Sequence, residues 1–401
     1  MKLAGGPPAI LLGGVNSLSV ARCLGRRGVE VLWAGDDDLR LSLSRYCSRL
    51  TLPDGPGGWP ARALAHLLGP DAGHLHGAVL LACNDPAVEL IARNRDALSE
   101  HYLIDAEAPG VQLCMLDKLS TYRAAEAAGV PTPRFWTLSS QEELEAIRAE
   151  LSFPLIVKPL DSAAFQAAFG GHKHLTAETW EELEPAMRRI SGAGLEFMLV
   201  ERVPGPDTQL CSYYTHMGDD GPVVDFTKRI VRRQPPGEGQ ATLHVTEWLP
   251  EVKELALRLL EHSGHRGLAA VEFKRDPRDG VLKLMEANVR FTGCNAIVAS
   301  AGVDLPAYVY ARLTGRDFAF PPRFREGRRL WNPRRDTQAA LTLRARGELT
   351  LGGWLRSLRL PAEMFYTVPD DPMPGLGGVV ETGRRLLRMT RRRRTPTKAL
   401  G

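Results

Sequence analysis

The stretch from residue 271 to residue 290 constrains the fold most, because its pattern predicts a β-hairpin. Two short runs with apolar residues flank Asp-Pro-Arg-Asp-Gly, and the step from Asp279 to Gly280 supplies the positive φ that a tight reversal needs. Glu272 and Glu286 have the same parity about a turn centred near Asp279. An antiparallel pairing about that turn sets the two carboxylates opposite each other on one face, roughly 5 Å apart.

Two facing carboxylates repel each other unless a positive charge lies between them. A hard divalent cation such as Mg²⁺ suits this place, because it takes a few protein oxygens and fills its other positions with substrate phosphates. Asn288 is two residues further along the same strand, so its amide oxygen joins that face. The hairpin therefore predicts a magnesium site. The alternative is a solvated sheet face on which the two glutamates are splayed apart in a different register.

Length and composition exclude several classes of protein. The chain has 401 residues, 44% of them hydrophobic and 24% charged, which allows two or three domains with their own cores. No apolar run approaches the roughly 20 residues of a membrane span, and residues 1–8 do not form a signal-peptide core. The six cysteines include no Cys-x-x-Cys pair, which disfavours a disulfide framework or a zinc site. We therefore expect a cytoplasmic protein without a membrane span.

The net charge of +4 is distributed unevenly along the chain. Residues 384–401 contribute +8 and contain no acid, so the rest of the chain carries about −4. This mildly acidic body disfavours nucleic acid as a partner. The basic segment is either a solvated, disordered end or a docking patch, and disorder is the favoured interpretation. If the segment docks, an acidic surface patch is favoured over anionic lipid or nucleic acid.

The N-terminal part predicts a Rossmann-like sheet. A buried strand at residues 9–12, a helix at residues 17–25 and a strand at residues 29–34 form a strand–helix–strand unit, without a complete G-x-G-x-x-G for a dinucleotide. A further strand at residues 78–82 leads to Asp85, at the carboxyl edge where such sheets bind ligands. Asp85 could contact a substrate there, but a cap for the following helix is favoured.

Cations in the middle of the chain occupy places that suit anion binding. Lys158 ends an apolar strand, where an unpaired lysine needs an anion, and Lys118 opens a helix. A basic cluster precedes a Pro-Pro-x-Gly stretch: Lys228, Arg229, Arg232 and Arg233. The alternatives are an ordinary strand-end lysine at position 158 and a solvated basic strand at the cluster.

Together, the lysines, the basic cluster and the facing carboxylates resemble the ATP-grasp fold, in which ATP is clasped between two α+β subdomains. The resemblance covers about residues 1–320 and rests on the order and spacing of several short motifs. It implies an α/β and α+β architecture with an antiparallel sheet. Its expected parts are a Rossmann-like domain (1–115), a small lid subdomain (116–198), a core subdomain with the metal site (199–320) and a C-terminal extension with the basic tail (321–401).

The resemblance assigns residues to a nucleotide. Lys118 belongs to the Asp-Lys pair that opens the ATP-binding region, and Lys158 looks like the strand lysine on the phosphates. At the hinge, the Glu201 carbonyl and the Val203 N–H would read the adenine edge. Asp207 matches the acid that accepts the ribose hydroxyls.

The resemblance also assigns the metal ligands and the catalytic arginines. The ligands of Mg²⁺, for which Mn²⁺ could substitute, would be Glu272, Glu286 and Asn288. Arg290 matches a residue near the transferred phosphate. Arg229 and Arg232 would neutralise the carboxylate or the acyl phosphate, since a guanidinium binds such groups in a bidentate manner.

Within the superfamily, several motifs look most like D-aspartate ligase-like carboxylate–amine ligases. They are Ser44-Arg45-Tyr46, residues 93–96, Arg229 with Arg232 before Pro-Pro-x-Gly, and Asp370-Asp371-Pro372-x-Pro374. Such enzymes phosphorylate a carboxylate with ATP, and an amine then attacks the acyl phosphate to give an amide. The resemblance thus implies small-molecule carboxylate and amine substrates, one of them an amino acid. A peptide or carrier-bound acceptor and a homodimer are left open.

The sequence departs from the family pattern in two places, the phosphate-covering loop and the segment after residue 330. The family's phosphate-covering loop is rich in small polar residues, whereas residues 163–169 are mostly Ala and Phe. The segment after residue 330 also departs from the better-known D-alanine ligases, so the acceptor cannot be named. Two other functions remain as alternatives: an ATP-grasp carboxylase that uses bicarbonate, and a non-catalytic regulatory module that binds a nucleotide.

Overall fold

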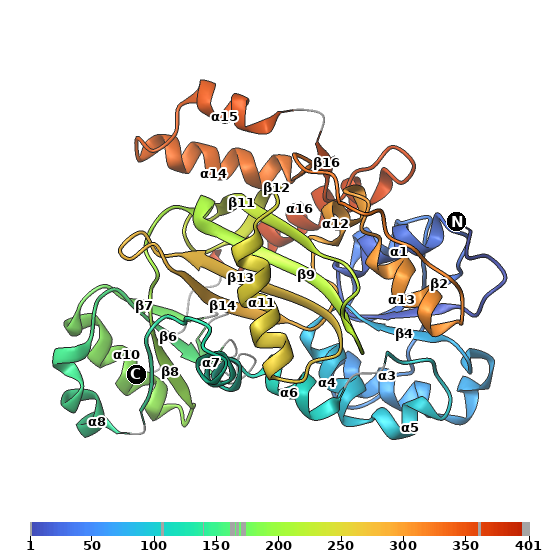
Figure 1. The fold of residues 1–401 in the computed structure, drawn as a ribbon, viewed down its shortest axis with the longest axis horizontal. Helices are drawn as coiled ribbons and strands as arrows, with labels where there is room; N and C mark the ends of the chain where they lie inside the picture. Colours follow the sequence, from blue (N-terminus) through green and yellow to red (C-terminus); the bar gives the residue numbers. More distant parts are fainter. Residues whose placement is uncertain are drawn as a thin grey trace. The chain divides into compact units, whose positions relative to one another are not determined.

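The computed structural model describes residues 2–105, 108–138, 140–160, 165, 168–169, 174–359 and 362–394 (Figure 1). The chain divides into two compact units. Unit 1 contains residues 1–109, 231–248 and 290–401, and unit 2 contains residues 110–230 and 249–289. Both units are therefore built from segments that are distant in the sequence. The predicted division into four parts along the chain stays a prediction.

Unit 1 begins with a parallel sheet in the order β3-β2-β1-β4. Its strands are β1 (Ala9–Leu12), β2 (Val31–Ala34), β3 (Ser48–Arg49) and β4 (Val79–Ala82). Helix α1 (Ser17–Gly25) connects β1 to β2, as the sequence predicted. The three longer strands are short apolar runs, as expected for strands covered on both faces.

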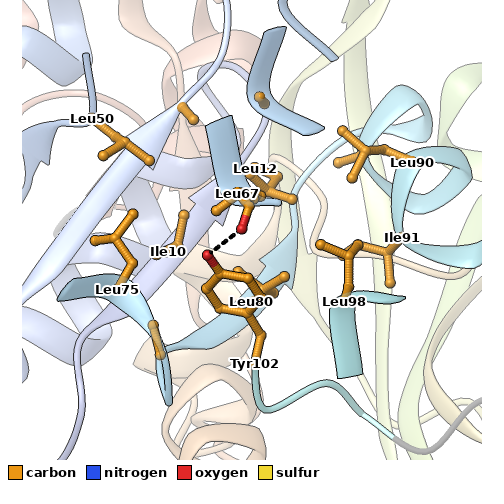
Figure 2. Close-up of a cluster of buried hydrophobic side chains, with 14 of the residues drawn as sticks. Ile10, Leu12, Leu50, Leu67, Leu75, Leu80, Leu90, Ile91, Leu98 and Tyr102 are labelled. Atoms are coloured by element: carbon orange, nitrogen blue, oxygen red, sulfur yellow. Dashed lines mark hydrogen bonds between the residues drawn. The ribbon is translucent and has the colours of Figure 1, made fainter. Parts of the chain in front are cut away.

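The core beside this sheet joins strands to the helices that follow them (Figure 2). Ile10, Leu12 and Leu80 from the sheet pack in one cluster with side chains of α3 (Trp59–Leu67), α4 (Asp85–Arg93) and α5 (Arg95–Ser99). Tyr102 is also buried in this cluster, and its hydroxyl donates to the carbonyl of Leu67 over 2.8 Å. The buried phenol therefore has a hydrogen-bond partner, as such groups require.

The rest of unit 1 contains the β12-β15-β16 part of an eight-stranded mixed sheet and mostly helices. Strand β12 (Gln240–Thr246) pairs antiparallel with β15 (Arg329–Trp331), which pairs parallel with β16 (Glu363–Met364). The helices are α2 (Leu39–Ser42), η1 (Pro70–Leu75), α12 (Asn295–Ser300), α13 (Leu305–Leu313), α14 (Pro333–Ala345), α15 (Leu351–Leu358) and α16 (Met373–Arg394). The backbone is helical through residue 394, where the sequence favoured disorder.

Unit 2 contains the antiparallel part of the eight-stranded sheet, in the order β14-β13-β9-β11. Its strands are β9 (Leu210–Gly218), β11 (Phe226–Gln234), β13 (Gly267–Arg275) and β14 (Leu282–Asn288), with β10 (Gly221–Pro222) paired to β9. Helix α11 (Pro250–His262) lies against β9, and α7 (Lys118–Ala127) lies against β14. Strand β11 crosses the boundary, because residues 231–234 belong to unit 1.

The second sheet of unit 2 is also antiparallel, in the order β5-β8-β6-β7. Its strands are β5 (Phe135–Thr137), β6 (Leu155–Pro159), β7 (Leu175–Ala177) and β8 (Phe197–Glu201). Other helices in the described part of the unit are α6 (Pro109–Leu116, its first residue in unit 1), α8 (Gln141–Ala146), η2 (Arg148–Glu150), α10 (Trp180–Gly192) and η3 (Asp207–Gln209). None of the helices within the described ranges is long and apolar enough to cross a membrane.

Most of the apolar loop at residues 161–174 lies outside the described residues. The predicted covering of the phosphates by this loop therefore also lies outside them. Phe165 and Phe169 are described and buried. Their rings stack with centroids 4.5 Å apart, and both belong to the core beneath the second sheet, with Val157 and Leu199. The phenylalanines that depart from the family pattern therefore complete a hydrophobic core.

A buried ion pair fixes the segment before α16 in unit 1. The Nε of Arg22 donates to Asp371 over 2.9 Å, and the two side chains are only 5% and 2% exposed. Asp371 also accepts hydrogen bonds from the Ser44 hydroxyl (2.8 Å) and the Arg45 N–H (3.0 Å). Its carboxylate is therefore buried but well satisfied.

The neighbouring carboxylate, Asp370, also forms an ion pair with an arginine, but this pair is exposed. Asp370 accepts from Arg26 and from the Tyr46 hydroxyl, each over 2.7 Å, and Arg26 and Asp370 are each more than 40% exposed. The motif Ser44-Arg45-Tyr46 and the motif Asp370-Asp371 are thus bonded to each other. Both hold the fold of unit 1 together.

We predict that Asp371→Ala lowers the free energy of unfolding by about 3–5 kcal/mol, because it leaves the buried Arg22 without its counter-charge. Asp370→Ala is the matched control and should cost less than about 1 kcal/mol, because its ion pair with Arg26 is exposed. Urea denaturation followed by tryptophan fluorescence measures both values. Equal losses in the two variants would contradict the assignment.

Candidate active site

The central hairpin has the predicted register. Strands β13 and β14 pair antiparallel with Glu272 opposite Glu286 and Ala270 opposite Asn288. The register shifts just beyond Glu272, so a β-bulge adjoins the glutamate pair. Gly280 in the turn has a φ of +74°, as a tight reversal requires. The alternative with the glutamates out of register is wrong.

The oxygen atoms at this pair form a set that suits Mg²⁺. Glu286 is exposed, and its Oε1 accepts from Asn288 Nδ2 over 3.0 Å, so the amide and the carboxylate lie side by side. Ser212 donates to Glu272 over 3.4 Å. In the described ranges no group of three His, Cys, Asp or Glu side chains gathers, so an all-protein cage is not formed there. Two carboxylates and one amide fit a cation that keeps its other positions for water or phosphate.

The strand pairings place two further residues in line with the glutamates. Glu272 lies opposite Ser212 on β9, and Ser212 lies opposite Lys228 on β11. Lys228, Ser212, Glu272 and Glu286 therefore form one row across four strands. Lys228 is 1% exposed, and its Nζ donates to the Ser212 hydroxyl over 3.2 Å and lies 5.5 Å from the ring centre of Tyr214. Since both partners are neutral, this buried ammonium favours an anion close to the row.

Lys158 reaches the hairpin through a tyrosine. Its Nζ donates to the Tyr122 hydroxyl over 3.2 Å and lies 5.3 Å from the centre of that ring. Tyr122 lies on α7 and donates in turn to the carbonyl of Met285, the residue before Glu286. Lys118 is the first residue of α7 and is half-buried. The structure thus brings the predicted phosphate lysine to the strand that carries a predicted metal ligand.

The predicted hinge is anchored by side chains from β13 and its turn. Glu201 ends β8, and its buried carboxylate pairs with Arg278 over 2.6 Å. Lys274 Nζ donates to the carbonyls of Val203 (2.8 Å) and Gly205 (3.0 Å). The N–H of Val203 has no acceptor in the described part of the chain, which leaves it for a ligand. Asp207 follows at the start of η3 and is 8% exposed.

Arg290 lies in unit 1, where it pairs with Asp85. The Phe291 N–H donates to the Ala82 carbonyl over 3.2 Å, so this segment runs past the carboxyl end of β4. The favoured prediction for Asp85 was wrong, because Asn84 caps α4 by accepting from the Ala87 N–H over 3.0 Å. The Asp85 side chain is 58% exposed beside the guanidinium of Arg290.

Arg232 has a structural role that its sequence position did not reveal. Its Nε and Nη2 both donate to the buried carboxylate of Asp336 over 2.8 Å, and its Nη1 donates to the Ser357 hydroxyl over 2.7 Å. Asp336 also accepts from Thr242 and from the Trp354 indole, each over 2.9 Å. This network joins β11 to α14 and α15 within unit 1.

The predicted pairing of two catalytic arginines on one strand therefore needs correction. Residues 229 and 232 are an odd number apart, so an extended strand directs their side chains to opposite faces. Arg229 is half-buried and lies opposite Cys211 on β9. Arg232 shares the face of Lys228, but its guanidinium is bound by Asp336 and Ser357. Arg229 lies on the opposite face of β11 from the row of Lys228, Ser212, Glu272 and Glu286, so neither arginine fits the predicted role beside the metal pair.

Comparisons with known proteins identify what this chain is similar to. Residues 220–332 match a family described as ATP-grasp in the biosynthetic pathway with Ter operon. D-aspartate ligase of Enterococcus faecium (strain Aus0004) is 27% identical over 243 residues, which cover 58% of this chain and 57% of that protein. A D-alanine–D-alanine ligase of Thermoanaerobacter sp. (strain X514) is 30% identical over 197 residues, 44% of this chain and 51% of that protein. The chain thus spans little more than half the length of these relatives.

Similar solved structures extend the likeness over more of the chain. The biotin carboxylase of Campylobacter jejuni, solved as a β-γ-ATP complex, superimposes with a TM-score of 0.61 at 14% identity. The superposition covers 80% of this chain and 74% of the carboxylase. At that identity the likeness concerns the fold alone.

The ion pairs in the turn after β13 predict a pH effect on stability. The guanidinium of Arg278 holds the pKa of the Asp276 carboxyl well below its usual range. Because the pKa is lower in the folded chain, the stabilisation is complete above the ordinary carboxyl pKa of about 3.9 and is lost as the pH falls through and below it. The urea midpoint should therefore fall further between about pH 6 and about pH 3 in the wild type than in Asp276→Asn. Identical pH profiles for the two proteins would refute this.

Proposed function

Because the chain has the ATP-grasp fold and is related in sequence to ATP-grasp ligases, we propose that it is an ATP-dependent carboxylate–amine ligase. A carboxylate oxygen attacks the γ-phosphorus of ATP, and the bond to ADP breaks. An amine nitrogen then attacks the carbonyl carbon of the acyl phosphate, the C–O bond to the phosphate breaks, phosphate leaves with the bonding electrons, and the nitrogen loses a proton. The products are an amide, ADP and phosphate. One substrate is an amino acid.

The observation that carries this proposal is the register of the hairpin. Glu272 and Glu286 face each other beside the Asn288 amide, and their oxygens suit a hard cation. These three residues would hold Mg²⁺, with Mn²⁺ as a substitute. The metal, when bound, supplies positive charge that neutralises the phosphates during transfer.

The remaining residues of unit 2 would hold the nucleotide. Lys118 and Lys158 would bind the phosphates, since phosphoryl transfer depends mostly on positioning and charge neutralisation. The Glu201 carbonyl and the Val203 N–H would bind the adenine edge, and Asp207 the ribose hydroxyls. Lys228 supports this assignment, because a buried ammonium in line with the metal pair adds positive charge where phosphate oxygens would gather.

One arginine would act on the reacting groups. Arg290 follows Asn288 by two residues and would bind the transferred phosphate. The carboxylate of Asp85 orients its guanidinium.

An ATP-grasp carboxylase is the second candidate, because a carboxylase shares the fold. The sequence relatives at 27% and 30% identity are ligases of D-aspartate and D-alanine, which favours amide formation. A non-catalytic module is disfavoured by the retained lysines and metal ligands. Phosphate release from ATP and Mg²⁺, screened against amino acids singly and in pairs, tests the proposal. Hydroxylamine should trap an acyl phosphate as a hydroxamate, whereas a strict requirement for bicarbonate would support the carboxylase.

We predict that Glu286→Gln abolishes turnover but keeps the fold, since a neutral amide balances less positive charge than a carboxylate. Phosphate release should fall more than about tenfold, which corresponds to about 1.4 kcal/mol. Binding of Mn²⁺, measured by electron paramagnetic resonance, should weaken in parallel. Glu254→Gln is the control, because Glu254 is 71% exposed on α11. A Glu286→Gln variant with near wild-type activity and metal binding would contradict the metal assignment.

We predict that Lys158→Ala lowers the affinity for ATP about tenfold or more, because a charge-assisted phosphate contact is lost in a partly desolvated place. Calorimetric titration with a non-hydrolysable ATP analogue measures the effect. Lys253→Ala serves as the matched control, because Lys253 forms a half-exposed pair with Asp225. If Lys158→Ala bound the ATP analogue as tightly as the wild type, Lys158 would be an ordinary strand-end lysine without a role in phosphate binding.

A further inference from the structure

Helix α16 has one face packed against the protein. At Gly377 an added Cβ would lie 3.1 Å from the Leu39 carbonyl and 3.2 Å from the Arg40 nitrogen, so the backbones of α16 and α2 approach closely. Glu381 accepts a hydrogen bond from the Leu39 N–H over 2.7 Å. Pro374, one turn before Gly377, is buried. These contacts fix which side of the helix faces the body of unit 1.

The other side of α16 exposes apolar side chains to solvent. Met373, Leu376, Val379 and Val380 are 46%, 54%, 63% and 39% exposed. Their spacing of three and four residues places them on one face of a helix. Scattered single apolar residues on a surface are ordinary, but four on one helical face form a patch.

The sequence continues this pattern into a strongly basic segment. Leu386 and Leu387 follow Val379 and Val380 at the next helical repeat of seven residues. Residues 384–394 also contain seven arginines and no acidic residue. An apolar face combined with clustered arginines is typical of helices that lie in the interface of anionic membranes.

We propose that α16 docks unit 1 on an anionic lipid surface. Leu376, Val379 and Val380 enter the boundary between headgroups and acyl chains, and the arginine run binds the lipid phosphates. A nucleic acid or an acidic peptide would satisfy the arginines but leave the apolar face in water. The exposed patch therefore favours lipid over the acidic partner that the charge alone suggested. The helix would lie on the membrane, and its packing against α2 holds the protein there.

Co-sedimentation of the full chain with vesicles tests this proposal. The protein should sediment with vesicles of phosphatidylcholine mixed with phosphatidylglycerol and stay in solution with phosphatidylcholine alone. The double variant Leu376→Glu/Val379→Glu should bind anionic vesicles about tenfold or more weakly, because apolar burial is replaced by like charge. Truncation after Gly383 should also weaken binding and remove most of its salt dependence.

Leu341→Glu is the matched control, because Leu341 is 60% exposed but lies on α14 of the same unit. It should bind anionic vesicles like the wild type. Circular dichroism of each variant verifies that the fold is kept. The proposal would be overturned if truncation weakened vesicle binding but the double variant bound vesicles as tightly as the wild type. Tighter binding to polyglutamate or DNA than to vesicles would also overturn it. Ligase activity without lipid is measured separately, so failure of the docking proposal leaves the proposed reaction untouched.

Discussion

Repulsion between two carboxylates is the constraint on which the rest of this site depends. The register of β13 and β14 sets Glu272 against Glu286. Like charges opposite each other on a sheet face are destabilising unless a cation or a buried ammonium compensates them. The protein places Lys228 in the same row, with the Ser212 hydroxyl between the ammonium and Glu272. The row is thus positive at one end and negative at the other. A metal at the negative end would complete a charge pattern that binds phosphate oxygens between two cations.

The sequence predicted those features of the site that depend on residues close together in the chain. The hairpin register followed from a turn and the alternation of a strand, both of which lie within about 20 residues. The row could not be found in the same way, because Lys228 meets Ser212 and Ser212 meets Glu272 only through the strand order β11-β9-β13. Arg232 was misassigned for a related reason, since its partner Asp336 lies far along the chain. The odd spacing from Arg229 to Arg232 was a local signal that both could not face one substrate.

Motifs that resemble a family can report its fold without reporting its substrate. Ser44-Arg45-Tyr46 and Asp370-Asp371 pointed toward D-aspartate ligase-like enzymes, yet in the structure they bond to each other and to Arg22 and Arg26. A buried pair such as Arg22 with Asp371 is costly to break, so its role in this chain is to stabilise the fold of unit 1. These motifs therefore carry no information on the amine. The residues proposed to bind the nucleotide would act on ATP and its phosphates, which carboxylate–amine ligases share, so they do not name the acceptor either.

Strand β13 couples the two halves of the proposed nucleotide site. It carries Glu272 at the metal pair and, two residues later, Lys274, whose ammonium binds the hinge carbonyls of Val203 and Gly205. The turn that follows β13 adds Arg278, which pairs with Glu201 at the end of β8. A strand is nearly inextensible, and two residues span about 7 Å. The distance from the proposed metal ligands to the proposed adenine edge is therefore set by the backbone of one strand within unit 2. A rigid spacing of this kind suits phosphoryl transfer, in which correct placement of the reacting phosphate provides much of the rate.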